Sequence, residues 1–218
     1  MTQISFFDPD CPVSELSGDL PHWRQSGVTY FVTFRLADSL PAEKLALWKT
    51  EQAAWLRQNP EPHTPSQRED YYIRFPRRLQ DWLDAGSGSC ILEDREVRSV
   101  VRNALLFFEG QRYQLGEFAI ASNHVHVIIT PLLEFELSDI LHSWKSFTAH
   151  KILKIEAAVR SLSNAAALNS RRGVRASVGA ASRRSSVSVW QKESFDHIVR
   201  SPESLEKFSA YIRAHILT

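Results

Sequence analysis

Alternating apolar and polar residues predict a strand at residues 28–36. Because every second side chain of a strand points to the same side, this segment has one strongly apolar face. That face consists of Val28, Tyr30, Val32, Phe34 and Leu36. Further strands are expected at residues 112–121, from residue 124 to about residue 131, and at residues 194–199. Ser122 and Asn123 form a tight turn, so the two strands beside it should pair as an antiparallel hairpin.

Helical spacing of apolar residues predicts five helices between and after these strands. They are expected at residues 41–58, 69–83, 95–108, 139–157 and from 202 to the end of the chain. Asp94 is a suitable N-cap for the third of them. Ser201-Pro202-Glu203 combines an N-cap, a proline at the first helical position and an early acid, which indicates the start of the last. Pro76 should break or kink the second.

Composition changes sharply at residues 157–189, which are rich in alanine, serine and arginine. We expect a flexible basic insertion there, either a solubilising loop or an arm that lies over nucleic acid.

Residues 1–19 read as an irregular leader, and residues 20–218 as one domain that contains the insertion. A formal net charge of +1 gives no overall sign of nucleic-acid binding, so local charge must carry that argument.

The two cysteines do not provide a disulfide framework, which fits a reducing compartment. The first ten residues lack the basic and apolar regions of a signal peptide, and no apolar run approaches the length needed to cross a membrane. We therefore expect a cytoplasmic protein without a membrane partner.

His124 and His126 provide the first candidate chemistry. Residues two apart on a strand face the same side, so two imidazoles would lie next to each other on a rigid support. Such a pair makes half of a metal site, although a surface strand with two solvated histidines has the same pattern. If the pair binds metal, we expect it to face an open polar pocket, so that replacing either histidine by alanine leaves the fold nearly intact.

The last helix carries the second candidate group. Leu205, Phe208, Ile212 and Ile216 form one apolar face. Tyr211 and His215 lie together on its flank, since residues four apart are neighbours on a helix. Both could be ordinary boundary residues. If this flank overlies the histidine strand, the tyrosine and a third histidine reach the first two together.

Several ordered stretches resemble the single-tyrosine transposases of the His-hydrophobic-His superfamily, specifically the group associated with repetitive extragenic palindromes. The resemblance spans roughly residues 20 to 213. Its segments, in order, are Pro21-His22-Trp23-Arg24-Gln25, Thr29-Tyr30-Phe31-Val32-Thr33-Phe34-Arg35-Leu36, Gly110-Gln111-Arg112-Tyr113, Asn123-His124-Val125-His126, Ser143-Trp144-Lys145-Ser146-Phe147, Trp190-Gln191, Ser194-Phe195-Asp196-His197-Ile198-Val199-Arg200 and Tyr211-Ile212.

The resemblance implies an α+β fold of ferredoxin-like or RRM-like type. Its central antiparallel sheet would have four or five strands and helices on one face, with the histidines on a central strand and the tyrosine on the C-terminal helix. It implies that His124 and His126 bind Mg²⁺ or Mn²⁺, with His215 as third ligand, and that Tyr211 is the nucleophile. The implied substrate is single-stranded DNA with hairpin-forming palindromes, cut through a 5′-phosphotyrosine and rejoined later, by a monomer or a homodimer.

Five residues are further candidates for contacts with nucleic acid. They are Trp23, Arg24, Lys145, Arg171 and Arg172. Core packing or a surface charge explains Trp23 and Arg24 about equally well, and a solvated charged surface is the default interpretation of Lys145. Two other functions also remain open: a protein that binds DNA hairpins without cutting them, and a metal-dependent hydrolase of small phosphate esters, in which Tyr211 would only pack.

Overall fold

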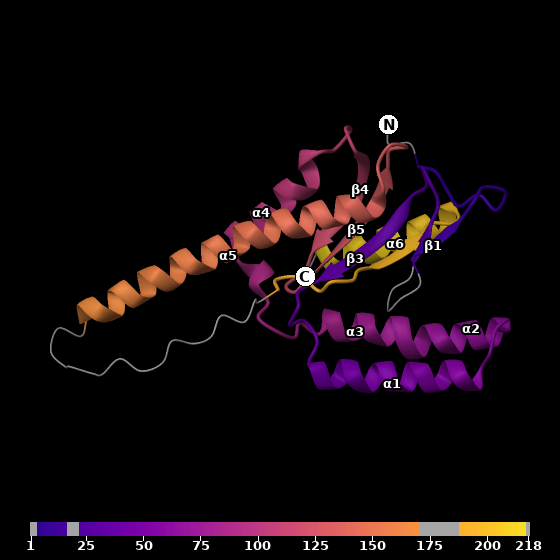
Figure 1. Cartoon of the computed structure of the whole chain (residues 1–218), viewed down its shortest axis with the longest axis horizontal. Helices are drawn as coiled ribbons and strands as arrows, with labels where there is room; N and C mark the ends of the chain where they lie inside the picture. The colour runs from indigo at the N-terminus through magenta and orange to yellow at the C-terminus, as the bar shows by residue number, and fades with distance from the viewer. Residues whose placement is uncertain (1–3, 17–21, 171–187, 217–218) are drawn as a thin grey trace.

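The structure, a computed structural model, describes residues 4–16, 22–170 and 188–216 (Figure 1). Its centre is a four-stranded antiparallel sheet with the strand order β4-β5-β3-β6. The strands are β3 (Tyr30–Arg35), β4 (Tyr113–Ile120), β5 (His124–Pro131) and β6 (Phe195–Ile198). The expected α+β fold is therefore confirmed, and the histidine strand β5 has a neighbour on each side.

A second, smaller ribbon lies near the N-terminus. In it, β1 (Ser14–Leu16) pairs with β2 (His22–Arg24). Backbone hydrogen bonds also join Phe7 to Val199 and Thr29 to Ser5. The part of the predicted irregular leader that the structure describes thus contains a strand and is tied to the sheet region.

Helices make up most of the remaining structure. They are α1 (Ala42–Gln58), α2 (Pro65–Tyr72), the π-helical turn η1 (Ile73–Arg77), α3 (Arg78–Asp84), the 3-10 turn η2 (Ile91–Glu93), α4 (Arg95–Phe107), α5 (Leu137–Ser170) and α6 (Pro202–Ile216). Pro76 lies inside the π turn, which joins α2 to α3 without a loop. The wider turn accommodates a residue that lacks a backbone N–H. Of the predicted break or kink, the break is therefore absent, and the proline interrupts the regular α-helix with a π turn.

The sheet has helices on both faces, not on one as expected. Alternate residues of β3 and β5, among them Tyr30, Val32 and Val127, belong to the main core together with residues of α4 and α5. The opposite side of the same strands contributes Phe31 and Ile128 to a second apolar cluster, which packs against α6. His124 and His126 share the parity of Ile128, so they lie on the α6 side.

The segment α1 to α3 forms a helical arm, residues 42–84, with its own apolar cluster. Figure 1 shows α1 running alongside α2 and α3, below the sheet in this view. Trp48, Trp55 and Phe75 are buried between these helices. The indole of Trp48 donates to the Phe75 carbonyl, and that of Trp55 to the Asp70 carboxylate. These hydrogen bonds satisfy both buried indole groups, as a small core requires.

Helix α5 continues to Ser170 and extends well beyond the sheet, although the insertion was expected to begin near residue 157 (Figure 1). Residues 171–187, the larger part of that expected insertion, lie outside the described residues. Among the residues that the structure describes, no helix is both long and apolar enough to cross a membrane.

Candidate active site

Four side chains from three separate elements converge on one point beneath α6. Asp84 at the end of α3, His124 and His126 on β5, and His215 on α6 each offer a ligand atom, and these atoms lie within 4.8 Å of one another. The Nε2 atoms of His124 and His126 are 2.8 Å apart. The Asp84 carboxylate is 3.0 Å from Nε2 of His215 and 3.5 Å from Nε2 of His124. We call these four residues the His-Asp cluster.

Local periodicity explains how the chain places three of them. The two histidines of β5 are separated by Val125, which points into the main core. On α6, Ile212 is buried in the second cluster and fixes the rotation of the helix. Tyr211 and His215 therefore overlie the histidine strand, with ring centres 4.4 Å apart and each 5.0 Å from the ring of His126. The structure brings together the residues that the sequence predicts to meet.

The three imidazoles present the same nitrogen to the centre of the cluster because Nδ1 is occupied elsewhere. Nδ1 of His124 is 2.7 Å from the side-chain oxygen of Asn123, and Nδ1 of His126 is 2.8 Å from the hydroxyl of Thr33. Nδ1 of His215 is 2.9 Å from the backbone oxygen of Tyr211. Partners of this kind fix the ring orientation and the tautomer of histidines that bind metals. The three histidines and Asp84 together offer three nitrogen donors and one oxygen donor, a set that fits a divalent cation.

The histidine pair is buried, which corrects the expectation of an open polar pocket. The relative exposure is 1% for His124 and 0% for His126. Burial lowers the pKa of His124 to about 4, and the charge of Asp84 opposes that change. Burial, followed by the charges of the other two histidines, also holds the pKa of His126 well below its ordinary value. Both rings are therefore neutral at pH 7, the state that a metal ligand needs.

The hydroxyl of Tyr211 donates to Asp84, with distances of 3.1 and 3.3 Å to the two carboxylate oxygens. Burial raises the pKa of this phenol well above its ordinary value, and the negative charge of Asp84 raises it further. The phenol thus stays protonated until a group nearby takes its proton. Asp84 is in contact with that proton and, through His124 and His215, with the rest of the cluster.

The sequence interpretation missed Asp84 and Gln80, both on α3. The side-chain nitrogen of Gln80 is 3.2 Å from Nε2 of His126. The two residues are four apart near the end of a helix, the same spacing as Tyr211 and His215, so they share one side of α3. That spacing was the available signal. Which molecular surface this side of α3 would face was not apparent from the chain, because the end of α3 reaches the histidine strand only in the tertiary fold.

The other predicted contact residues lie away from the His-Asp cluster. Arg24 is buried at 8% exposure and forms an ion pair with Asp196, so its guanidinium is committed inside the protein. Trp23 is 45% exposed, with the guanidinium of Arg200 5.4 Å from its ring. Lys145 is half-buried and donates to the backbone oxygens of Gln191 and Lys192. Burial, then the charge of Arg35, lowers the pKa of Lys145 to about 8.

Arg171 and Arg172 lie outside the described residues. Of the five candidates for DNA contact, Trp23 has the exposed ring that base stacking requires. Arg24 and Lys145 each have a hydrogen-bond or ion-pair partner within the protein, which accounts for their position without DNA. Arg24 would have to break a buried ion pair to reach a phosphate, which is costly.

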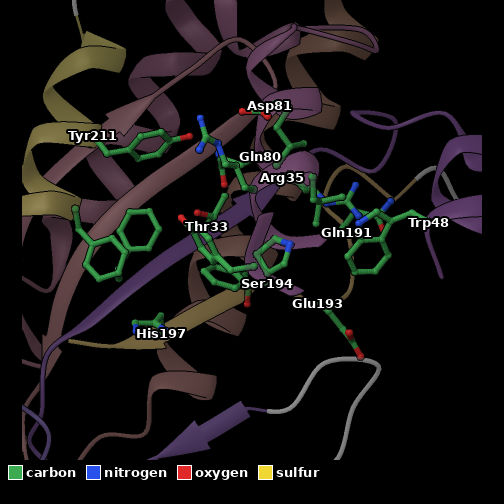
Figure 2. A pocket seen from close by; sticks show the side chains of 18 of the residues that line it. Thr33, Arg35, Trp48, Gln80, Asp81, Gln191, Glu193, Ser194, His197 and Tyr211 are labelled. Carbon is green, nitrogen blue, oxygen red and sulfur yellow. The ribbon is translucent and has the colours of Figure 1, made fainter. Parts of the chain in front are cut away.

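A cleft of about 1150 Å³ opens beside the cluster, between the helical arm and the strand β6 with α6 (Figure 2). Tyr211, Gln80 and Thr33 line it, and each of these residues also touches a member of the cluster. In Figure 2, Tyr211 extends from α6 toward Gln80, on the other wall. The cleft therefore leads to the hydroxyl of Tyr211.

Comparisons with known proteins give little additional guidance. No protein-family model matches the chain, and no curated protein matches it. Among solved structures, the chain is similar to a REP-associated tyrosine transposase bound to a REP hairpin, with 11% sequence identity and a TM-score of 0.37. The similarity covers 90% of this chain and 70% of that one.

Proposed function

We propose that this protein is a metal-dependent, single-tyrosine transposase that cuts and rejoins single-stranded DNA at hairpin-forming palindromes. One observation carries the proposal: the hydroxyl of Tyr211 lies beside three histidines whose Nε2 atoms converge on Asp84. A tyrosine in contact with a set of metal donors is suited to covalent attack on a phosphodiester, because a bound cation offsets the negative charge of the phosphate. The ordered sequence motifs that resemble this family support the same function.

His124, His126 and His215, together with Asp84, would hold the Mg²⁺ or Mn²⁺ ion. When bound, a divalent cation polarises a non-bridging phosphate oxygen and reduces the repulsion between the phosphate and an attacking anion. Asn123 and Thr33 keep the histidine rings turned toward that position. Gln80, next to His126 and on the cleft wall, can donate to a phosphate oxygen from the other side.

In the proposed reaction, the phenolic oxygen of Tyr211 attacks the phosphorus of the DNA backbone. The bond between the tyrosine oxygen and phosphorus forms, and the bond between phosphorus and the 3′ oxygen breaks. The Asp84 oxygen that lies 3.1 Å from the phenol takes its proton, while the other oxygen, which is near His215, would face the cation. The leaving 3′ oxygen takes a proton from solvent water to become a hydroxyl, and Asp84 returns its proton to the solvent. Attack of a 3′-hydroxyl on the phosphotyrosine reverses these changes, so rejoining needs no external energy source.

The test is incubation of the protein with a 3′-labelled hairpin oligonucleotide and Mn²⁺, followed by denaturing electrophoresis. The label is at the 3′ end because a 5′-phosphotyrosine retains the downstream fragment. We expect a labelled protein–DNA adduct that depends on the metal and is absent with Tyr211→Phe, which keeps the ring and removes only the hydroxyl. An oligonucleotide of the same composition with scrambled palindrome arms is the matched substrate control. Cleavage of the oligonucleotide without an adduct would favour the alternative of a metal-dependent phosphoester hydrolase. Binding of the hairpin without cleavage would favour a protein that only binds DNA.

A further inference from the structure

The cleft beside the cluster is much larger than the phosphate that Tyr211 would attack. Its volume of about 1150 Å³ is above the usual range of small-ligand pockets, which is roughly 300–1,000 Å³. The helical arm forms one wall with residues of α1, η1 and α3, and β6 with α6 forms the other. A ligand that fills it would therefore extend some distance from the phosphate, between two separate structural units.

Positive charge is concentrated in this cleft. The lining cations come from both walls and are Arg35, Lys49, Arg77, Lys192 and Lys207. The acidic residues of the lining are Asp81 and Glu193. The lining of the cleft thus has a larger excess of positive charge than the whole chain, whose formal net charge is only +1. Such an excess along an open groove favours a chain of phosphates over an uncharged ligand.

Aromatic rings lie among these cations. Phe195 of β6 and Phe208 of α6 are half-buried in the cleft wall, and Phe208 stacks on Phe31 with ring centres 4.4 Å apart. Tyr72, at the end of α2 on the opposite wall, is 57% exposed. Unpaired bases stack on exposed aromatic faces, and the combination with a basic groove is typical of proteins that hold single strands without reading their sequence.

We propose that this cleft binds the single-stranded segment of DNA next to the cut phosphate, and that the helical arm is the outer wall of this binding site. The inference rests on the proposed function, because it takes Tyr211 as the point where the strand is cut. The phosphates of the strand pair with Arg77 and Lys207 on opposite walls, and its bases stack on Phe195, Phe208 and Tyr72. The arm contributes both to strand binding and, through Gln80 and Asp84, to the cluster.

The experiment measures binding separately from cleavage. A fluorescent, unstructured oligothymidine of about 15 nucleotides is titrated with the full-length protein in EDTA, over a range of salt concentrations from about 50 to about 200 mM. Arg77 and Lys207 are exposed and lie outside the cluster, so the double variant Arg77→Glu/Lys207→Glu should fold normally. We expect its affinity to fall about tenfold or more, and its salt slope to flatten by about 0.7 for each phosphate that is no longer neutralised.

The matched control reverses two cations on the other face of the sheet. Arg102 of α4 and Lys154 of α5 are also exposed, and Arg102→Glu/Lys154→Glu makes the same change in net charge. We expect it to keep the wild-type affinity within about twofold. Equal losses in both double variants, no loss in either, or no binding of the oligothymidine by the wild type would overturn the inference.

A second measurement locates the strand. Photocrosslinking with 5-iodouracil in place of thymine, followed by mass spectrometry, should give crosslinks in peptides that contain Phe195, Phe208 or Tyr72. Crosslinks confined to the peptide of Trp23 would contradict the inference. Failure of the proposed function has a different result: the hairpin would give no adduct, while the oligothymidine would still bind and still respond to Arg77→Glu/Lys207→Glu.

Discussion

At the scale of single residues, the site depends on hydrogen bonds that hold the histidine rings. The hydroxyl of Thr33 is bonded to Nδ1 of His126, on the side of the ring that faces away from the cluster. Its contribution to metal binding would therefore act through the orientation of one ring. Loss of a partner of this kind typically lowers metal affinity about 10- to 100-fold.

Thr33→Val should therefore weaken Mn²⁺ binding by about 10- to 100-fold while all proposed ligands remain. Isothermal titration calorimetry of the two proteins measures this ratio. Thr29→Val is the matched control, because Thr29 is also buried and its hydroxyl is 2.8 Å from that of Thr130, in a pair separate from the cluster. Equal Mn²⁺ affinity of Thr33→Val and wild type would show that this hydrogen bond does not tune the site.

Burial of the histidines changes what their replacement should do. His124→Ala removes a ring that is 1% exposed and leaves the side-chain oxygen of Asn123 without this partner, so the fold should lose stability, contrary to the expectation from the sequence. We expect a loss of about 1–3 kcal/mol in the free energy of unfolding, from the cavity and the unpaired side-chain oxygen of Asn123. Urea denaturation in EDTA measures it. A urea midpoint equal to that of the wild type would contradict the burial of the histidine pair and favour an exposed one.

The depressed pKa of His124 also predicts how stability depends on pH. The ring is neutral in both the folded and the unfolded state above its ordinary pKa of 6.5. As pH falls toward about 4, the unfolded state binds a proton that the folded state still excludes, so stability decreases. The loss should be on the order of 3 kcal/mol.

Urea denaturation in EDTA at neutral pH and at a pH just above the folded-state pKa of His124 tests this dependence. His215 and Asp84 face the same ring, so the comparison with His124→Gln isolates the contribution of His124. We expect the variant to lose less stability than the wild type over this interval. The same loss in both proteins would assign the pH dependence to other groups.

At the scale of elements, the helical arm is stabilised largely within itself. Its buried residues Trp48, Trp55 and Phe75 form a cluster separate from the two clusters of the sheet. The end of the arm nevertheless supplies Gln80 and Asp84 to the site. Local unfolding of the arm would therefore remove two groups from the site and leave the sheet in place.

Trp48→Ala tests this separation. Trp48 is 3% exposed, and loss of such a side chain costs about 3–5 kcal/mol in a packed core. We expect faster hydrogen exchange of amides in α1 and α3, little change in β3 and β5, and slower formation of the DNA adduct. Faster exchange throughout the sheet would mean that the arm and the sheet unfold together.

At the scale of the whole molecule, the charge of the chain is unevenly distributed. Residues 171–187 contain five arginines and no acid. Thr148 of α5 is hydrogen-bonded to Trp190, but α5 continues for 22 residues to Ser170, about 33 Å at 1.5 Å per residue, so deletion of residues 171–187 would unwind the end of the helix. Replacing the five arginines with serine keeps the length of the segment. This replacement would change the formal net charge from +1 to −4.

We expect this replacement to reduce the affinity for the oligothymidine and to flatten its salt dependence, because fewer arginines would displace counterions. The same fluorescence titration measures both quantities. Replacing the same five arginines with lysine keeps the charge of the segment and is the matched control. An unchanged salt slope would mean that the segment does not contact DNA.

Local patterns in the chain were enough to predict most elements and the two local pairs of the site. The period of two predicts β3 and places His124 and His126 on one face, and the helical period places Tyr211 beside His215. These relations depend only on backbone geometry within one element. Start signals such as Asp94, which accepts hydrogen bonds from the Glu96 and Val97 amides, are equally local.

Which surfaces meet depends instead on long-range packing. Burial of the histidine pair and the contact of Asp84 with Tyr211 depend on where α6 and the end of α3 lie against the sheet, and the sheet has helices on both faces because α4 and α5 pack on the other side. Asp84 and Tyr211 are 127 residues apart in the chain. The pattern around Asp84 describes an ordinary helix end, because a local period specifies a face of an element and not the partner that covers it.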